Sequence, residues 1–206
     1  MKAFKKNIYK TESEVVSCLD VTIGAQIWTS CNLNVSEFRD GTPIPEITDP
    51  ALWYSATTPA WCHYGNSTAN GIVYGKLYNW YAVADVAHGG LAPSGYHIPT
   101  ISEWNTLLTT VGGISVAGGE LKEIGFSHWL TPNTGAVDTF NFTALGNGYR
   151  DGTTGVFYSL KQYAELWASD LYLGSPLTYT LSKDSVGITS HTGVETLGAA
   201  IRLVKD

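Results

Sequence analysis

The stretches YGKLYNWYAVAD (residues 74–85) and SGYHIPTISEW (residues 94–104) follow one another closely and decide the expected fold. The apolar positions at i, i+3, i+4 and i+7 of the first stretch are Tyr74, Leu77, Tyr78 and Tyr81. This spacing predicts a helix with one aromatic face. We expect that face to pack against a sheet, because large rings at helical spacing usually fill a core.

The second stretch predicts the start of another helix. Thr100 is followed three residues later by Glu103, which forms the pattern of a capping box, where hydroxyl and carboxylate bond backbone N–H groups of the first turn. Apolar residues at helical spacing follow, namely Trp104, Leu107, Leu108 and Val111. Gly112 and Gly113 are expected to end this helix.

The remaining sequence predicts strands and long loops. We expect a first strand at residues 21–27, a proline-rich loop at 39–58 and a short helical turn at 118–124. Beyond residue 141, short apolar runs separated by glycine indicate further strands. These runs are FTALGNGY, GVFYSL, ELWASD, LTYTLS, SVGITS and AAIRLV. The expected fold class is therefore α+β, with a twisted antiparallel sheet, two helices and long loops.

The composition agrees with a single folded unit and argues against one class of partner. The chain has 206 residues, of which 44% are hydrophobic and only 15% are charged. That supply is sufficient for one sizeable core. The net charge is -6, and the sequence lacks the clusters of Lys and Arg that phosphate contacts require. We therefore expect no nucleic-acid partner.

The order and spacing of many segments resemble the bacterial family called the Fibrobacter succinogenes major paralogous domain. The similarity runs from IGAQIWTSCNLNV (23–35) through the two opening stretches and FTALGNGYRD (142–151) to the closing AAIRLVKD. The resemblance implies a C-type lectin-like fold of the formylglycine-generating-enzyme branch. It covers residues 21–206, which leaves residues 1–20 as an N-terminal extension that we expect to attach to a larger assembly.

The enzymes of that branch use a reactive cysteine pair in the C-terminal part of the domain, whereas this chain has no Cys after Cys62. The five histidines are scattered without metal-site spacing. The calcium-binding sugar motifs of lectin-like domains are also missing from the sequence. We therefore expect no enzyme and no cofactor, although the oxygen-rich loops leave room for a structural calcium ion.

The cysteines bear on the compartment in which the chain matures. Relatives commonly carry a Cys pair at the positions that read Ala92 and Leu203 here, and joint loss of such a pair is expected in a reducing compartment. The odd number and the spacing of Cys18, Cys31 and Cys62 favour buried free thiols. A disulfide between two of them is the alternative.

Residues 1–20 carry basic residues without the apolar stretch of a secretory signal, and no membrane span is apparent. We therefore expect synthesis in the cytoplasm without a signal peptide and without membrane insertion. The expected destination is a virion. A cell-surface location applies instead if an export signal was removed.

The expected function is that of a non-enzymatic binding or adhesion module. The first hypothesis is a phage virion protein of the head or tail fibre, for receptor binding or decoration, that recognises a host-surface glycan or protein. Residues 1–20 would contact the virion, and a homo-oligomer would add avidity. An exported bacterial surface adhesin or lectin-like domain is the alternative, followed by a degenerate formylglycine-generating-type enzyme.

The ligand is expected on the face formed by the C-terminal strands and loops. Tyrosine offers a large contact area at low entropy cost and serine adapts its hydrogen bonds. The candidate contacts are Tyr158, Tyr163, Tyr172, Tyr179, Ser182, Lys183, Asp184, Thr189, Ser190 and His191. The alternative is that these are ordinary exposed strand residues.

Overall fold

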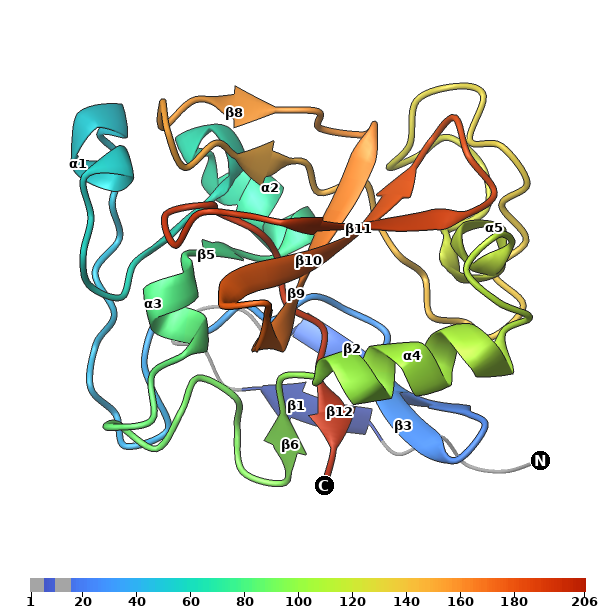
Figure 1. Cartoon of the computed structure of the whole chain (residues 1–206), viewed down its shortest axis with the longest axis horizontal. Helices are drawn as coiled ribbons and strands as arrows, with labels where there is room; N and C mark the ends of the chain where they lie inside the picture. The colour runs from blue at the N-terminus through green and yellow to red at the C-terminus, as the bar shows by residue number, and fades with distance from the viewer. Residues whose placement is uncertain (1–5, 10–15) are drawn as a thin grey trace.

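The computed structural model describes residues 6–9 and 16–206 and shows a mixed α+β fold. The largest of its sheets has five antiparallel strands in the order β1-β2-β3-β12-β6. Their bounds are β1 Lys6–Tyr9, β2 Val16–Ile23, β3 Gln26–Thr29, β12 Val204–Lys205 and β6 Tyr96–His97. The last strand of the chain thus lies beside the first described hairpins, at the bottom of Figure 1.

A three-stranded antiparallel sheet forms the centre of the face seen in Figure 1. It consists of β9 (Tyr163–Tyr172), β10 (Ser175–Ser182) and β11 (Ile188–Thr192). These strands confirm three of the predicted runs, ELWASD, LTYTLS and SVGITS. The other three runs are mostly loop, because they contribute only β7 (Tyr149–Arg150), β8 (Phe157–Tyr158) and β12.

The single strand predicted at residues 21–27 is instead a hairpin. β2 ends at Ile23, and Gly24 takes the positive φ of +61° that a tight two-residue turn requires before β3 begins. The expected boundary between residues 20 and 21 falls inside β2. The described part of the N-terminal segment therefore belongs to the five-stranded sheet, whereas residues 1–5 and 10–15 of the expected extension lie outside the described residues.

The predicted capped helix is confirmed as α4 (Ile101–Thr110). Thr100 Oγ1 accepts the backbone N–H of Glu103 at 3.2 Å, and the Glu103 carboxylate accepts the backbone N–H of Thr100 at 2.8 Å. Gly112 and Gly113 follow with φ of +100° and +99°, a conformation in which the helix cannot continue. The short helical turn predicted at 118–124 is α5 (Ala117–Leu121).

The helix predicted over residues 74–85 is wrong. α2 (Thr68–Tyr74) ends where that helix should begin, and β5 (Leu77–Tyr78) and a single turn α3 (Trp80–Val83) follow. Gly75 breaks the helix, because it adopts φ +75° and lies so close to the Leu33 carbonyl that a Cβ would stand 2.8 Å from it. The apolar residues of this stretch do belong to the core, since Tyr74, Leu77 and Tyr78 are buried, but they do so without forming a helix.

The remaining short elements connect these sheets and helices. They are α1 (Pro50–Tyr54), β4 (Trp61–Cys62) and η1 (Tyr64–Asn66). α1 lies inside the loop predicted at 39–58, and the side chain of Asp49 caps it. Within residues 6–9 and 16–206, no helix has the length and apolar character to cross a membrane.

The core lies between α4 and the two larger sheets. Trp104 from α4 contacts Trp28 of β3, with ring centroids 5.1 Å apart. On its other side it stacks on Tyr179 of β10, with centroids 4.5 Å apart and planes at 22°. All three rings are buried, so α4 joins the two sheets through stacked aromatic side chains.

The expectation that all three cysteines are free thiols is wrong for two of them. Cys18 and Cys31 form a disulfide, and Cys62 is the buried free thiol. The hairpin explains the pairing: Asp20 pairs with Thr29 at the end of the ladder, and continuing that register sets residue 18 opposite residue 31. Such bridges are typical of proteins that mature in oxidising environments.

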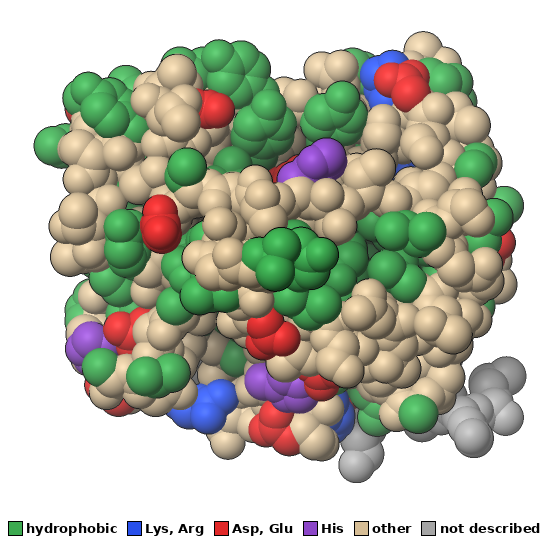
Figure 2. All heavy atoms as spheres, viewed as in Figure 1, with side chains coloured by type: hydrophobic (Ala, Val, Ile, Leu, Met, Phe, Trp, Pro, Cys, Tyr) green, Lys and Arg blue, Asp and Glu red, His purple; other side chains and the backbone are tan. Residues whose placement is uncertain are grey.

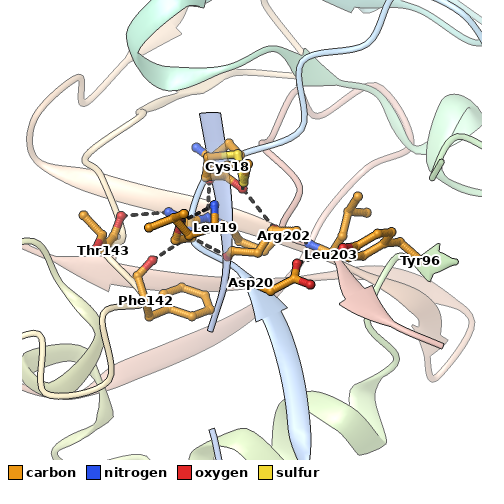
Figure 3. Close-up of a disulfide and its surroundings, with 12 residues drawn as sticks. Cys18, Leu19, Asp20, Tyr96, Phe142, Thr143, Arg202 and Leu203 are labelled. Atoms are coloured by element: carbon orange, nitrogen blue, oxygen red, sulfur yellow. Dashed lines mark hydrogen bonds between the residues drawn. A yellow bond between two sulfur atoms is a disulfide. The ribbon is translucent and has the colours of Figure 1, made fainter. Parts of the chain in front are cut away.

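Arg202 lies beside the disulfide, and Figure 3 shows its side chain extending toward Phe142 and Thr143. Its guanidinium donates to the carbonyls of Phe142, Thr143 and Thr29 and to the side-chain oxygen of Asn32, at 2.6 to 2.9 Å. Arg202 is fully buried, and burial lowers its pKa to about 9. This one side chain therefore joins two separate stretches of the chain, residues 29–32 and 142–143, to the C-terminal segment.

Candidate functional site

A pocket of about 490 Å³ opens between β7, the β9–β11 sheet and the loops around residues 151–153 and 192–197. The alternation of side chains along β10 explains why the pocket is polar. Leu177, Tyr179 and Leu181 point into the core, whereas Thr178 and Thr180 line the pocket on the other face. The sheet therefore separates an apolar interior from a hydroxyl-lined cavity.

Glu165 of β9 lies in this pocket with only 7% of its surface exposed. Thr178 Oγ1 donates to Glu165 Oε1 in a short hydrogen bond, and Thr180 Oγ1 donates to Oε2 at 2.8 Å. Burial raises the pKa of the carboxyl, although the two hydroxyl groups oppose that shift. Each carboxylate oxygen keeps capacity for a further hydrogen bond, because it has several acceptor positions.

Asp151 contributes a second carboxylate to the lining. Its Oδ1 accepts hydrogen bonds from the backbone N–H and the hydroxyl of both Thr153 and Thr154, at 2.7 to 2.9 Å. Partial burial raises the pKa of Asp151, but these hydrogen bonds outweigh it and the net shift is downward. Asp151 is therefore ionised at neutral pH, and Oδ2 takes no part in these four bonds.

Tyrosine and histidine side chains form the rest of the polar lining. Tyr149 and Tyr163 both line the pocket, and the ring of Tyr149 lies 5.8 Å from that of Tyr158 across the β7–β8 pair. Burial raises the pKa of Tyr149, and the negative charges of Glu165 and Asp151 add to the effect. The phenol therefore stays protonated and can donate a hydrogen bond.

Four of the ten predicted contact residues lie at or beside this pocket. Tyr163 and His191 line it, the hydroxyl of Thr189 is 2.9 Å from His191 Nε2, and Tyr158 contacts Tyr149. All four predicted residues are exposed at the surface to a substantial degree. This end of the C-terminal sheet therefore brings four of the candidate residues to one concave surface.

Five other candidates lie elsewhere on the surface. Tyr172 is half exposed at the opposite end of β9, in the β9–β10 hairpin, where Figure 2 shows hydrophobic side chains gathered in the middle of this face. Ser182 ends β10, and Lys183 and Asp184 lie in the turn that follows; Lys122 donates a 2.7 Å hydrogen bond to the Ser182 carbonyl at this point. Ser190 is exposed, one residue along β11 from His191, and lines no part of the pocket.

The prediction that Tyr179 contacts a ligand is wrong. Only 3% of Tyr179 is exposed, and it stacks on Trp104 in the core. The reason is the strand period: Tyr179 lies between two threonines that face the pocket, so its own side chain faces the other way. Tyr179 is therefore unavailable to a ligand.

The sequence reasoning missed Glu165, Asp151, Tyr149, Thr178 and Thr180. One signal was present, because the run LTYTLS alternates threonine with apolar residues and Glu165 interrupts the apolar start of its own strand. A carboxylate inside a buried strand needs donors from a neighbouring strand, and the threonines supply them. Only the strand pairing shows that these residues are adjacent.

The pocket offers hydrogen-bond acceptors, hydroxyl groups and aromatic rings, and it carries no Lys, Arg or Cys among its lining residues, all of which fall in the described part of the chain. Across residues 6–9 and 16–206, no group of three or more His, Cys, Asp or Glu side chains could hold a metal ion. Such a lining suits recognition of a small polar group by hydrogen bonds and ring contacts.

Comparison with known proteins gives one match. The sequence model of the family described as Fibrobacter succinogenes major domain matches residues 21–205. No curated protein and no solved structure matches the chain.

Proposed function

We propose that this chain, which belongs to the Fibrobacter succinogenes major domain family, is a non-enzymatic binding module whose ligand occupies the pocket beside β7 and the β9–β11 sheet. The observation that carries the proposal is the composition of that pocket. Exposed tyrosine, histidine and threonine side chains surround a buried carboxylate on the face turned away from the core. Aromatic and hydroxyl groups converging in one concavity are typical of recognition sites.

The proposal includes a C-type lectin-like fold of the formylglycine-generating-enzyme branch. In support, the chain combines a mixed α+β architecture with long irregular segments, and its family was expected to have this fold. The ligand pocket then lies on the C-terminal strands, where such domains present their variable surface.

Two settings fit a binding module, and the disulfide favours one of them. An exported bacterial surface adhesin or lectin-like domain acquires a bridge such as Cys18–Cys31 during passage through an oxidising compartment. A phage virion protein that binds a host-surface glycan or protein is the alternative setting. It remains compatible with the bridge, because lysis also releases the protein into an oxidising medium.

A degenerate enzyme of the formylglycine-generating type has the least support. Cys62 is completely buried, and burial raises the pKa of its thiol to about 12. A reactive cysteine instead has a lowered pKa and access to solvent. The free cysteine of this chain is thus held as a thiol inside the core, and the C-terminal part has no cysteine to take its place.

The test compares two tyrosines on the same strand. Tyr163 and Tyr172 lie at the two ends of β9 and are 37% and 50% exposed, but only Tyr163 lines the pocket. The purified full chain should bind members of an array of bacterial surface glycans and synthetic peptides. We expect Tyr163→Ala to abolish that binding and Tyr172→Ala to preserve it, because an aromatic contact is lost only from the pocket.

Thermal unfolding of both variants serves as the control for folding. If Tyr172→Ala abolishes binding while Tyr163→Ala leaves it intact, the ligand lies at the hairpin and the proposed site is wrong. If none of the glycans and none of the peptides binds, the proposed function itself fails.

A further inference from the structure

The charges that line the pocket are unevenly distributed. Asp151 and Glu165 supply two carboxylates, whereas His191 is the only basic side chain in the lining, whose residues are all described. In Figure 2 the larger Lys and Arg surfaces of this face lie toward its margins. The pocket therefore has a negative potential, which attracts positively charged groups and repels anions.

Glu165 has no direct cationic partner in the described part of the fold, and the basic side chain that acts on it is His191, through space. Among the residues that the structure describes Glu165 forms no ion pair, and its two hydrogen bonds come from the neutral hydroxyls of Thr178 and Thr180. By contrast, Glu103 and Glu123 each contact a histidine at 2.6 and 2.8 Å. A buried carboxylate is stabilised when a positive charge approaches it, so a cationic ligand would supply what the fold omits.

Aromatic rings stand beside the two carboxylates. Tyr149 and Tyr163 line the same pocket, and Tyr158 packs on Tyr149. Tyrosine rings attract organic cations through their electron-rich faces, and the attraction grows when water is excluded. Carboxylates and aromatic rings together are the groups that recognise ammonium and guanidinium ions in proteins.

The size of the cavity agrees with an organic group. Its volume of about 490 Å³ falls within the range of roughly 300–1,000 Å³ that holds small organic ligands. A long side chain or one sugar ring fits such a space, whereas a bare metal ion would need several converging ligands. Two carboxylates and one histidine spread around a wide pocket do not converge in that way.

We propose that this pocket selects an organic cation, an ammonium or guanidinium group, which pairs with Glu165 and Asp151 and contacts the rings of Tyr149 and Tyr163. The inference rests on the proposed function, since it names the chemistry of the ligand at that same site. The cation belongs to a basic side chain of a surface protein or to an amino sugar of a surface glycan. Both sources present the same group to the pocket.

The experiment titrates the full chain with two matched pairs of probes and follows binding by calorimetry. One pair is Nα-acetyllysine amide and Nα,Nε-diacetyllysine amide, and the other is glucosamine and N-acetylglucosamine. Acetylation removes the positive charge from each amine at which it is added. We expect at least one charged probe to bind about ten-fold or more tightly than its acetylated partner, as a close charge pair requires. The pair that shows the preference identifies the source of the cation.

Two variants connect that preference to the pocket. Glu165→Gln keeps the shape of the side chain while removing its charge, and it should eliminate the preference for the charged probe. Asp151→Asn should weaken it, which provides a second test if the first variant folds poorly. Asp184→Asn is the matched control, because Asp184 is exposed in the turn after β10 and lines no part of the pocket; it should leave the preference unchanged.

Three results would overturn the inference. They are equal binding of charged and acetylated probes, a preference that survives in both pocket variants, and absence of binding by all four probes. The proposed function has a separate outcome. If neutral array ligands bind and Tyr163→Ala abolishes that binding, the pocket is a recognition site but its ligand is not a cation.

Discussion

Arg202 and Glu165 are both buried charges that form no ion pair with a described residue, but their surroundings differ. The guanidinium is fully buried and donates to the backbone carbonyls of Thr29, Phe142 and Thr143, which ties two distant stretches of the chain to the C-terminal segment. The carboxylate accepts from two hydroxyls of the next strand and borders an open pocket. The comparison indicates that the first charge holds the fold together, whereas the second remains available to a ligand.

The largest effect is expected when Arg202 is replaced. Arg202→Met removes four hydrogen bonds and leaves their acceptors buried without donors. We expect the free energy of unfolding to fall by about 3–5 kcal/mol, as measured by denaturant unfolding. Lys205→Met is the control from the same segment: its exposed ion pair with Asp20 should contribute little. Similar losses in the two variants would contradict the structural role of Arg202.

A smaller loss is expected when the disulfide beside Arg202 is removed. Cys18→Ser opens a loop closed across a sequence separation of 13 residues. Chain entropy then predicts a loss of about 3 kcal/mol in the free energy of unfolding. A reducing agent should destabilise the native protein by a similar amount and leave the variant unchanged. If reduction has no effect on the native protein, the bridge adds nothing to the Arg202 region.

The smallest effect on stability is expected at Glu165. The pKa of Glu165 is raised by burial, so the folded state binds its proton more tightly than the unfolded state does. The native protein should therefore gain stability relative to Glu165→Gln as the pH falls from neutral toward the unfolded pKa of about 4.3. At neutral pH we expect the two proteins to differ by no more than about 1 kcal/mol.

Thermal unfolding of both proteins across this pH range measures the difference in their stability. The contributions of the other carboxylates are the same in both proteins and cancel in that difference. A difference that grows in favour of the native protein as the pH rises would mean that the ionised carboxylate is well stabilised. Glu165 would then resemble Arg202, and the contrast between the two charges would disappear.

Features set by local sequence were predictable. The capping box of Thr100 and Glu103 and the paired glycines define α4 without help from the rest of the chain. The helix predicted from Tyr74 onward failed because the same spacing also serves a strand and a turn packed in a core. Gly75 ends the helix with a positive φ, and it packs against the backbone of Leu33, which is far away in the sequence.

The site was predictable only where exposure and strand position could be inferred together. Tyr163 and His191 were identified as polar residues of terminal strands, and they do line the pocket. Tyr179 was assigned to the wrong face, since composition does not reveal the phase of a strand. Glu165 was missed because its partners, Thr178 and Thr180, come from a different strand. Predicting the disulfide would likewise have required knowledge of strand pairing, namely the register of the β2–β3 hairpin.

The Cys18–Cys31 bridge also determines how the chain would carry a mechanical load. Tension applied from the N-terminal side reaches residue 18 and passes through the covalent bond directly to residue 31. The hairpin between them, including the turn at Gly24, is bypassed and cannot be pulled out. For a domain attached on its N-terminal side and bound to a ligand at its C-terminal strands, extension that has reached residue 18 can continue only beyond residue 31.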